Sequence, residues 1–134
     1  MKKEIESFQA QAVERTKSYL LTEIQTVNGV NVITRVLEMQ PNSVKDLVFQ
    51  LRAAVQAPFL CVIGSKFQDK PMLTVMMSDD MVSDHGLNAG QMVREAAKLI
   101  QGGGGGQPHF AQAGGKNTDG LSAAVDKVIA LANL

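Results

Sequence analysis

The sequence predicts an α/β fold: a central mixed β-sheet of about four strands, flanked by helices and preceded by an N-terminal linker helix. Three observations lead to this prediction. Runs of apolar and β-branched residues alternate with segments whose apolar residues recur at helical spacing. Apolar residues make up 45% of the 134 residues and charged residues 19%, as in a globular domain. A sheet with helices on both faces buries both kinds of segment.

The N-terminal residues 3–24 are predicted to form a helix, because they contain neither Gly nor Pro and carry apolar side chains at helical spacing. We therefore assign residues 1–26 to a helical linker and residues 27–134 to a globular domain. The apolar stripe of this helix is thin and consists of Ile5, Phe8, Ala12, Tyr19 and Ile24. Such a helix needs a partner, which is either the rest of the molecule or a second copy of itself.

The first strand and the helix after it follow from local signals. Residues 30–37 come after a turn at residues 28–29 and are rich in β-branched side chains, which predicts a strand. A helix is expected to start at Ser43, because Ser43 and Asp46 have the Ser-x-x-Asp spacing of a helix start. Pro58 ends the segment that contains this helix.

The second half of the chain predicts a hairpin, a helix, a short strand and a final helix. Residues 59–64 and 72–77 are continuous apolar runs joined by a polar turn, which predicts a hairpin buried on both faces. Asn88 is the expected cap of the next helix. Residues 110–113 are predicted to form a short edge strand, and Asp119 starts the last helix.

Composition limits the functional classes. The 13 basic and 13 acidic residues cancel, which argues against a strong nonspecific nucleic-acid binder. Cys61 is the single cysteine, so an intrachain disulfide and a cysteine metal cluster are excluded, and its apolar neighbours predict burial. No apolar run approaches the roughly 20 residues of a membrane span, and the N-terminus lacks the apolar segment of a signal peptide. We expect a cytoplasmic location and no membrane partner.

The most informative stretch is the run of five glycines at residues 102–106. Seven of the 12 glycines of the chain lie within residues 102–116. Because glycine loses more conformational freedom on folding than other residues, such a run implies that the backbone has an unusual task. The spacing does not fit a P-loop or a dinucleotide-binding turn. Two interpretations stay open: backbone N–H groups that contact a phosphate or sugar, and a tight crossover packed under a neighbouring element.

Charged residues flank the glycines. Arg94 and Lys98 lie four residues apart on the helix before them, and Lys116 follows them. These cations form either a phosphate-facing patch or an ordinary solvated face. No residues have the spacing of a metal site, and no nucleophile accompanies a base. We therefore expect no catalysis by this chain alone.

The glycine-rich stretch from Gly102 to Gly115 resembles the glycine-rich signature of the C-terminal domain of alanyl-tRNA synthetase. Residues 27–32 look like the entry strand of that domain, and residues 89–97 look like the helix ahead of its glycine loop. The resemblance covers about residues 27–134. The helix before residue 27 suits the spacer that joins this domain to the editing domain.

The resemblance implies a non-catalytic module that binds alanine tRNA near the outer corner of the L, helps two active sites to cooperate and dimerises in some members. Its other partners are the remaining domains of the parent synthetase. That enzyme is expected to use ATP, Mg and Zn, whereas this chain is expected to hold no cofactor. The RNA-contacting role that the resemblance implies falls on Gly102, Gly103, Gly104, Gly105, Gly106, Gln107, Gln112, Gly114, Gly115, Lys116, Arg94 and Lys98.

Two alternatives to this function stay open. A related domain is attached to Asp-His-His phosphoesterases, where it serves as an accessory oligonucleotide-binding domain. The loop of that branch reads Gly-Gly-Gly-His-Pro, and Gln107 stands here in place of the histidine. The second alternative is a structural dimerisation module, in which the first helix pairs with a copy of itself.

Overall fold

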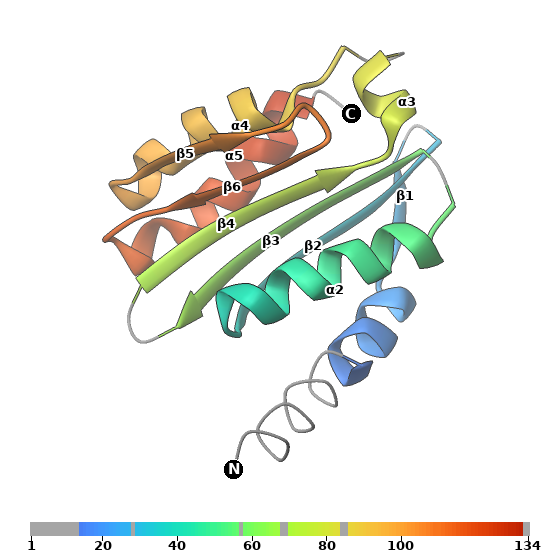
Figure 1. Ribbon diagram of the computed structural model, residues 1–134, viewed down its shortest axis with the longest axis horizontal. Helices are drawn as coiled ribbons and strands as arrows, with labels where there is room; N and C mark the ends of the chain where they lie inside the picture. Colours follow the sequence, from blue (N-terminus) through green and yellow to red (C-terminus); the bar gives the residue numbers. More distant parts are fainter. Residues whose placement is uncertain (1–13, 28, 57, 68–69, 84–85, 133–134) are drawn as a thin grey trace.

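The computed structural model describes residues 14–27, 29–56, 58–67, 70–83 and 86–132 (Figure 1). Within these ranges, six strands form one sheet in the order β1-β2-β3-β4-β6-β5. Their bounds are Gln25–Val27 for β1, Val30–Glu38 for β2, Phe59–Phe67 for β3, Lys70–Met77 for β4, Gly103–Gly106 for β5 and Phe110–Gly114 for β6. The predicted strands correspond to β2, β3, β4 and β6, which fill the four central places of the sheet. The α/β class is confirmed, with six strands rather than about four.

Helices cover both faces of this sheet. The helical segments of the described chain are residues 14–22, α2 (Pro41–Ala54), α3 (Asp79–Ser83), α4 (Ala89–Ala97) and α5 (Leu121–Ala132). Short 3-10 helices, η1 (Lys98–Ile100) and η2 (Thr118–Gly120), adjoin α4 and α5. Helix α2 lies on one face of the sheet, and α4 and α5 lie on the other (Figure 1). Strands β2 and β3 are parallel and joined through α2, whereas the other neighbouring strands are antiparallel.

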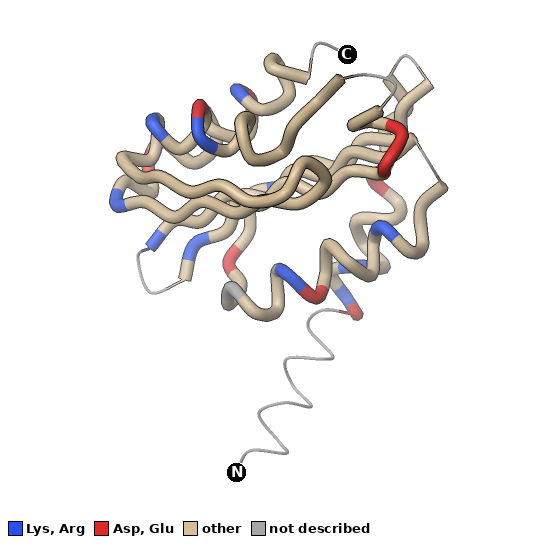
Figure 2. Tube along the Cα trace, turned by 45° about the horizontal axis from the view of Figure 1, so that its top comes forward, with Lys and Arg blue, Asp and Glu red and all other residues tan. Residues whose placement is uncertain are grey.

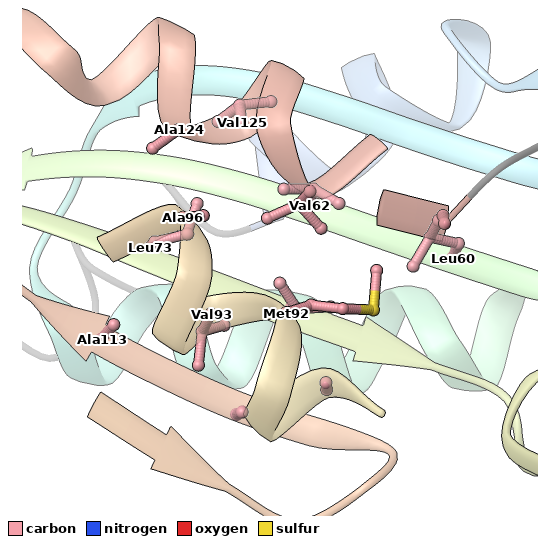
Figure 3. Close-up of a cluster of buried hydrophobic side chains, with 14 of the residues drawn as sticks. Leu60, Val62, Leu73, Met92, Val93, Ala96, Ala113, Ala124 and Val125 are labelled. Atoms are coloured by element: carbon pink, nitrogen blue, oxygen red, sulfur yellow. The ribbon is translucent and has the colours of Figure 1, made fainter. Parts of the chain in front are cut away.

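The central strands are buried on both faces, which explains their continuous apolar sequences. Along β3, Phe59, Cys61 and Ile63 pack in the layer beneath α2. The alternate residues Leu60 and Val62 pack in the layer formed by α4 and α5. This alternation follows from the two-residue period of a strand. Figure 3 shows side chains of the second layer: Leu60, Val62, Leu73, Met92, Val93, Ala96, Ala113, Ala124 and Val125.

The two strands that the sequence pattern does not predict are the edge strands β1 and β5. Strand β1 lies where the first helix was expected to end, and it turns into β2 at Gly29, whose φ of 82° suits glycine. Strand β5 consists of four glycines, which are disfavoured in strands. Main-chain pairing with β6 forms it nonetheless. Residues 110–113 therefore lie inside the sheet, between β4 and β5, and the prediction of an edge position was wrong.

The helix starts show one correct and two incorrect predictions, since α5 begins at Leu121, directly after η2, rather than at Asp119. Helix α2 begins at Pro41 rather than Ser43, and Gln40 before it makes no side-chain cap. Proline suits the first turn of a helix because the N–H that it lacks has no partner there. Asn88 caps α4 as predicted, since its Oδ1 accepts a hydrogen bond from the N–H of Gln91 at 3.1 Å.

The described part of the first helix, residues 14–22, contacts the sheet layer beneath α2. Leu20 is fully buried there. Tyr19 stays exposed, and the guanidinium of Arg35 lies 4.8 Å from the centre of its ring. Of the other stripe residues, Ile24 is half-buried against the same layer, and Ile5, Phe8 and Ala12 lie outside the described residues.

The division into a linker of residues 1–26 and a domain of residues 27–134 stays a prediction. Its boundary falls inside β1, whose Gln25 and Thr26 pair with Val32 and Asn31 of β2. No helix in the part of the chain that the structure describes combines the length and the apolar character needed to cross a membrane.

We predict that Cys61 of the folded protein does not react with a thiol reagent. Burial raises the pKa of the Cys61 thiol above its ordinary range, so the reactive thiolate is not formed. The free energy of unfolding should fall as pH rises above about 8.5, because the thiol then ionises in the unfolded chain but not in the folded one. Absorbance with a disulfide reagent measures the reaction. Urea-unfolded protein is the control, and complete labelling under native conditions would contradict the prediction.

Candidate nucleic-acid interface

The glycine run forms one strand of a hairpin instead of a loop. Strand β5 pairs with β6 from Gly103 opposite Gly114 to Gly106 opposite Ala111. The turn between the strands is closed by a hydrogen bond of 2.8 Å from the N–H of Gln107 to the carbonyl oxygen of Phe110. The glycines are therefore ordered by main-chain pairing along the edge of the sheet.

Alternate glycines of this hairpin leave no room for a side chain. A Cβ atom at Gly104 would lie 2.4 Å from the carbonyl oxygen of Gln112 and 2.5 Å from the Cα of Ala113. A Cβ atom at Gly106 would lie 2.7 Å from the carbonyl oxygen of Phe110. In contrast, a Cβ atom at Gly103 would meet no atom within 4 Å. Close approach of two main chains thus explains why glycine is needed at the even-numbered positions.

Helix α4 and the adjoining η1 are hydrogen-bonded to the two ends of the hairpin. At its start, the N–H of Ala89 donates to the carbonyl oxygen of Pro108 in the turn, at 2.8 Å. At its end, the N–H of Lys116 donates to the carbonyl oxygen of Ile100 in η1, also at 2.8 Å. Gly90 supports the first contact, because a Cβ atom there would lie 3.0 Å from the carbonyl oxygen of Gly106. The tight-crossover interpretation of the glycines therefore has direct structural support.

The hairpin also limits which backbone groups are open to a ligand. In an antiparallel pair, residues whose N–H and C=O groups point toward the partner strand alternate with residues whose groups point away from it. Gln107 and Phe110 are a hydrogen-bonded pair. The N–H and C=O groups of Gly104 and Gly106 therefore point away from β6. The main-chain N and O atoms of Gly106 lie against Gly90 of α4. The exposed Gly104 thus presents the outward peptide group of this edge. The structure offers one strand edge to a phosphate or sugar, instead of a loop of several converging N–H groups.

The three predicted cations lie in different surroundings. Arg94 lies beside the hairpin, with its Nε 3.6 Å from the position that a Cβ of Gly105 would occupy. Lys98 is paired with Glu95 at 3.3 Å, so part of its charge is compensated. No described carboxylate lies within 4.0 Å of the charged groups of Arg94 or Lys116. Arg94 and Lys116 are therefore better placed than Lys98 to contact an anion.

A groove lies at the end of the sheet where β4 begins and β6 ends, and Figure 2 shows Lys and Arg positions gathered at this end. Its volume is about 670 Å³. The predicted site residues that line it are Gly102, Gln112, Gly114, Gly115 and Lys116. Its lining contains no Asp or Glu among the described residues. The groove therefore favours an anionic ligand.

The structure thus divides the predicted site into four parts. One part is the groove, and a second is the strand of Gly103–Gly106 with Arg94 beside it. Gln107 lies in the turn at the opposite end of the hairpin, and Lys98 follows α4. The contact of these residues with RNA stays a prediction.

Sequence reasoning missed Lys70 and Gln101, which also line the groove. The pairing of β4 with β6 brings Lys70 into the same groove as Lys116, although 45 residues separate them in the chain. The basic Lys70 at the start of β4 was the available signal, but the pairing of β4 with β6 was needed to interpret it. Gln101 has a left-handed backbone with φ of 54°, which no sequence pattern indicates.

Comparison with known proteins identifies relatives of the chain. A family model described as the DHHA1 domain matches residues 29–134. An alanine–tRNA ligase from Bacteroides fragilis is 52% identical over 134 residues, covering 100% of this chain and 15% of the ligase. A second ligase, from Christiangramia forsetii, is 42% identical over 127 residues, covering 95% of this chain and 14% of the ligase. The chain thus spans about 15% of the length of the curated relatives it matches.

Solved structures give the same result. The C-Ala domain from Aquifex aeolicus alanyl-tRNA synthetase matches with a TM-score of 0.68 and 30% identity, covering 82% of this chain and 95% of that chain. RecJ from Thermus thermophilus, in complex with Mg²⁺, matches with a TM-score of 0.62 and 19% identity, covering 95% of this chain and 18% of that chain. The RecJ likeness shows a shared fold alone. Together these matches confirm the resemblance that the glycine-rich stretch indicates.

We predict that Gly104→Ala lowers the free energy of unfolding by about 1–3 kcal/mol, the usual cost of overpacking, because its Cβ would collide with the main chain of β6. Gly103→Ala is the matched control, with the same chemical change one residue earlier in the same strand. It should change the free energy of unfolding by less than about 1 kcal/mol, since its Cβ meets open space. Urea unfolding followed by circular dichroism measures both values, and equal losses would contradict the close-approach explanation.

Proposed function

The chain belongs to the DHHA1 domain family, and on this premise we propose that it is a non-catalytic tRNA-binding module of an alanyl-tRNA synthetase. The observation that carries the proposal is the position of Arg94 and Lys116 beside the glycine hairpin, without a described carboxylate to pair either charge. Ligases that act on tRNA contain a segment similar to this whole chain. An RNA backbone supplies the anionic groups that such cations bind.

The proposed role is to hold alanine tRNA while other domains of the parent synthetase charge and edit it. ATP, Mg and Zn then belong to those domains, and this chain needs no cofactor of its own. Within the described residues, no group of three or more His, Cys, Asp or Glu side chains could hold a metal ion. The cytoplasm, where tRNA is charged, is the proposed location.

The charge distribution predicts weak binding by the isolated chain. Its net charge is zero, so long-range attraction of RNA is small. Each cation that neutralises a phosphate releases about one counterion, so a few cations give a shallow dependence of affinity on salt. Tethering to the parent protein would compensate, because it raises the effective concentration of the tRNA at this surface.

Two other functions receive less support. An accessory role in a phosphoesterase rests on fold likeness to RecJ, and Gln107 replaces the histidine that this branch carries. Dimerisation through the first helix stays a prediction, because most of its apolar stripe lies outside the described residues.

We predict that replacing Arg94 and Lys116 with Gln weakens tRNA binding and lowers the slope of log affinity against log salt by about 0.7–0.9 per lost phosphate contact. Lys98→Gln should have a smaller effect, because Lys98 is paired with Glu95. Fluorescence anisotropy with labelled alanine tRNA, at two salt concentrations, measures these changes.

Lys127→Gln is the matched control, since Lys127 is exposed on α5 and does not line the groove. An unrelated tRNA serves as the control for specificity. Unchanged affinity of the Arg94 and Lys116 variants would show that the RNA surface lies elsewhere. Absence of saturable binding by the unaltered chain, also at low salt, would remove the support for an RNA-binding role of this chain alone.

A further inference from the structure

The groove at the end of β4 and β6 combines an apolar floor with a basic rim. Met39, Phe67, Pro71 and Met72 line it alongside the two lysines Lys70 and Lys116. A surface that bound only a phosphate backbone would need cations and polar groups, but no such apolar floor. The groove therefore suits a ligand that has both an anionic and a flat apolar part.

The two lysines line the same groove from two segments that are far apart in the chain. The pairing of Met72 with Gly114 continues by one residue, because the N–H of Gly115 donates to the carbonyl oxygen of Pro71 at 3.2 Å. Lys70 precedes Pro71, Lys116 follows Gly115, and both lysines line the groove. No described carboxylate pairs with either lysine. Two ammonium groups that line one groove, neither paired with a described carboxylate, can bind one phosphate group.

The floor offers a surface for a planar ring. Phe67, the last residue of β3, is 37% exposed and lines the groove, so part of its ring is open to a ligand. Met72 adds a polarizable thioether, a group that contacts aromatic rings favourably. The Nε2 atom of Gln112 lies 3.3 Å from the Oγ1 of Thr74 and 3.8 Å from the Sδ of Met72, so these contacts hold the amide at the floor.

The size of the groove fits one nucleotide. Its volume of about 670 Å³ lies within the roughly 300–1,000 Å³ of small-ligand sites. A base inside an RNA duplex cannot expose its face to such a floor, whereas an unpaired base can leave the stack and pack on aromatic side chains.

We propose that this groove binds a single unstacked nucleotide of RNA, with the base against Phe67 and Met72 and the phosphate between Lys70 and Lys116. The inference rests on the proposed RNA-binding function and extends it from backbone contact to capture of an unpaired base. It places the nucleotide at the end of the hairpin remote from the Gln107–Phe110 turn.

The test compares a labelled single-stranded RNA of about eight nucleotides, within the usual site size of single-strand binding domains, with a duplex of equal length. The single strand should bind more tightly. Phe67→Ala should weaken its binding by roughly five- to tenfold, the lower range for removing an aromatic stacking partner. Phe49→Ala is the matched control, because Phe49 is 41% exposed and lies outside the groove. Lys70→Gln should weaken binding several-fold, with Lys127→Gln as its control.

A second measurement reports on the groove directly. The methyl NMR signal of Met72, assigned with Met72→Leu, should shift on addition of the single strand and much less on addition of the duplex. An acidic peptide of equal length that shifts the signal as strongly as RNA would overturn the proposal. So would equal affinity for single strand and duplex together with unchanged binding by Phe67→Ala.

The two proposals fail in different ways. If the chain binds tRNA but Phe67→Ala and Lys70→Gln leave all RNA affinities unchanged, the groove assignment is overturned and the tRNA-binding function stands. If the chain binds no tRNA while the single strand shifts the Met72 signal, the tRNA-binding function fails and the groove assignment holds.

Discussion

Close contact between main chains is the constraint on which this part of the fold depends. Gly104 and Gly106 let β5 approach β6 more closely than any side chain would allow, and Gly115 packs against the carbonyl oxygen of Ile100 with the same lack of space. Because α4 and the adjoining η1 are hydrogen-bonded to the two ends of the hairpin, these helices, the sheet edge and the cations they carry are positioned together. The glycine run thus first allows the main chains to pack closely. The residues that are candidates for ligand contact are positioned by that packing.

The distribution of charge matters more here than its total. A net charge of zero describes the whole chain, yet Lys70 and Lys116 line one groove at the end of the sheet, and no described carboxylate lines that groove. Elsewhere cations are paired, as in the contact of 2.9 Å between Arg52 and Asp79. A neutral protein can therefore present a local anion-binding surface without strong attraction for nucleic acid in general.

The sequence alone was sufficient to predict the elements that are determined by residues close together in the chain. The apolar runs of β3 and β4 and the cap at Asn88 are confirmed because burial and capping act within a few residues. Strand β5 could not be predicted, since glycine has no strand preference and the strand exists through its pairing with β6. The sequence also could not place Lys70 and Lys116 in one groove, because the groove depends on the pairing of two strands far apart in the chain. Arg94, Lys98 and Lys116 were found from the sequence, but Lys70 and the groove were not.

The composition of β5 also has a consequence for evolution. A strand made only of Gly103–Gly106 displays main-chain atoms at the sheet edge, so this edge carries no side chains through which selection could tune recognition. Replacement at Gly104 or Gly106 is opposed by the neighbouring strand itself. Divergence between relatives is then expected at Gly103 and in the residues around the hairpin, such as Gln107 in its turn and Arg94 on α4. Gly104 and Gly106 would stay unchanged while the partners of the domain change.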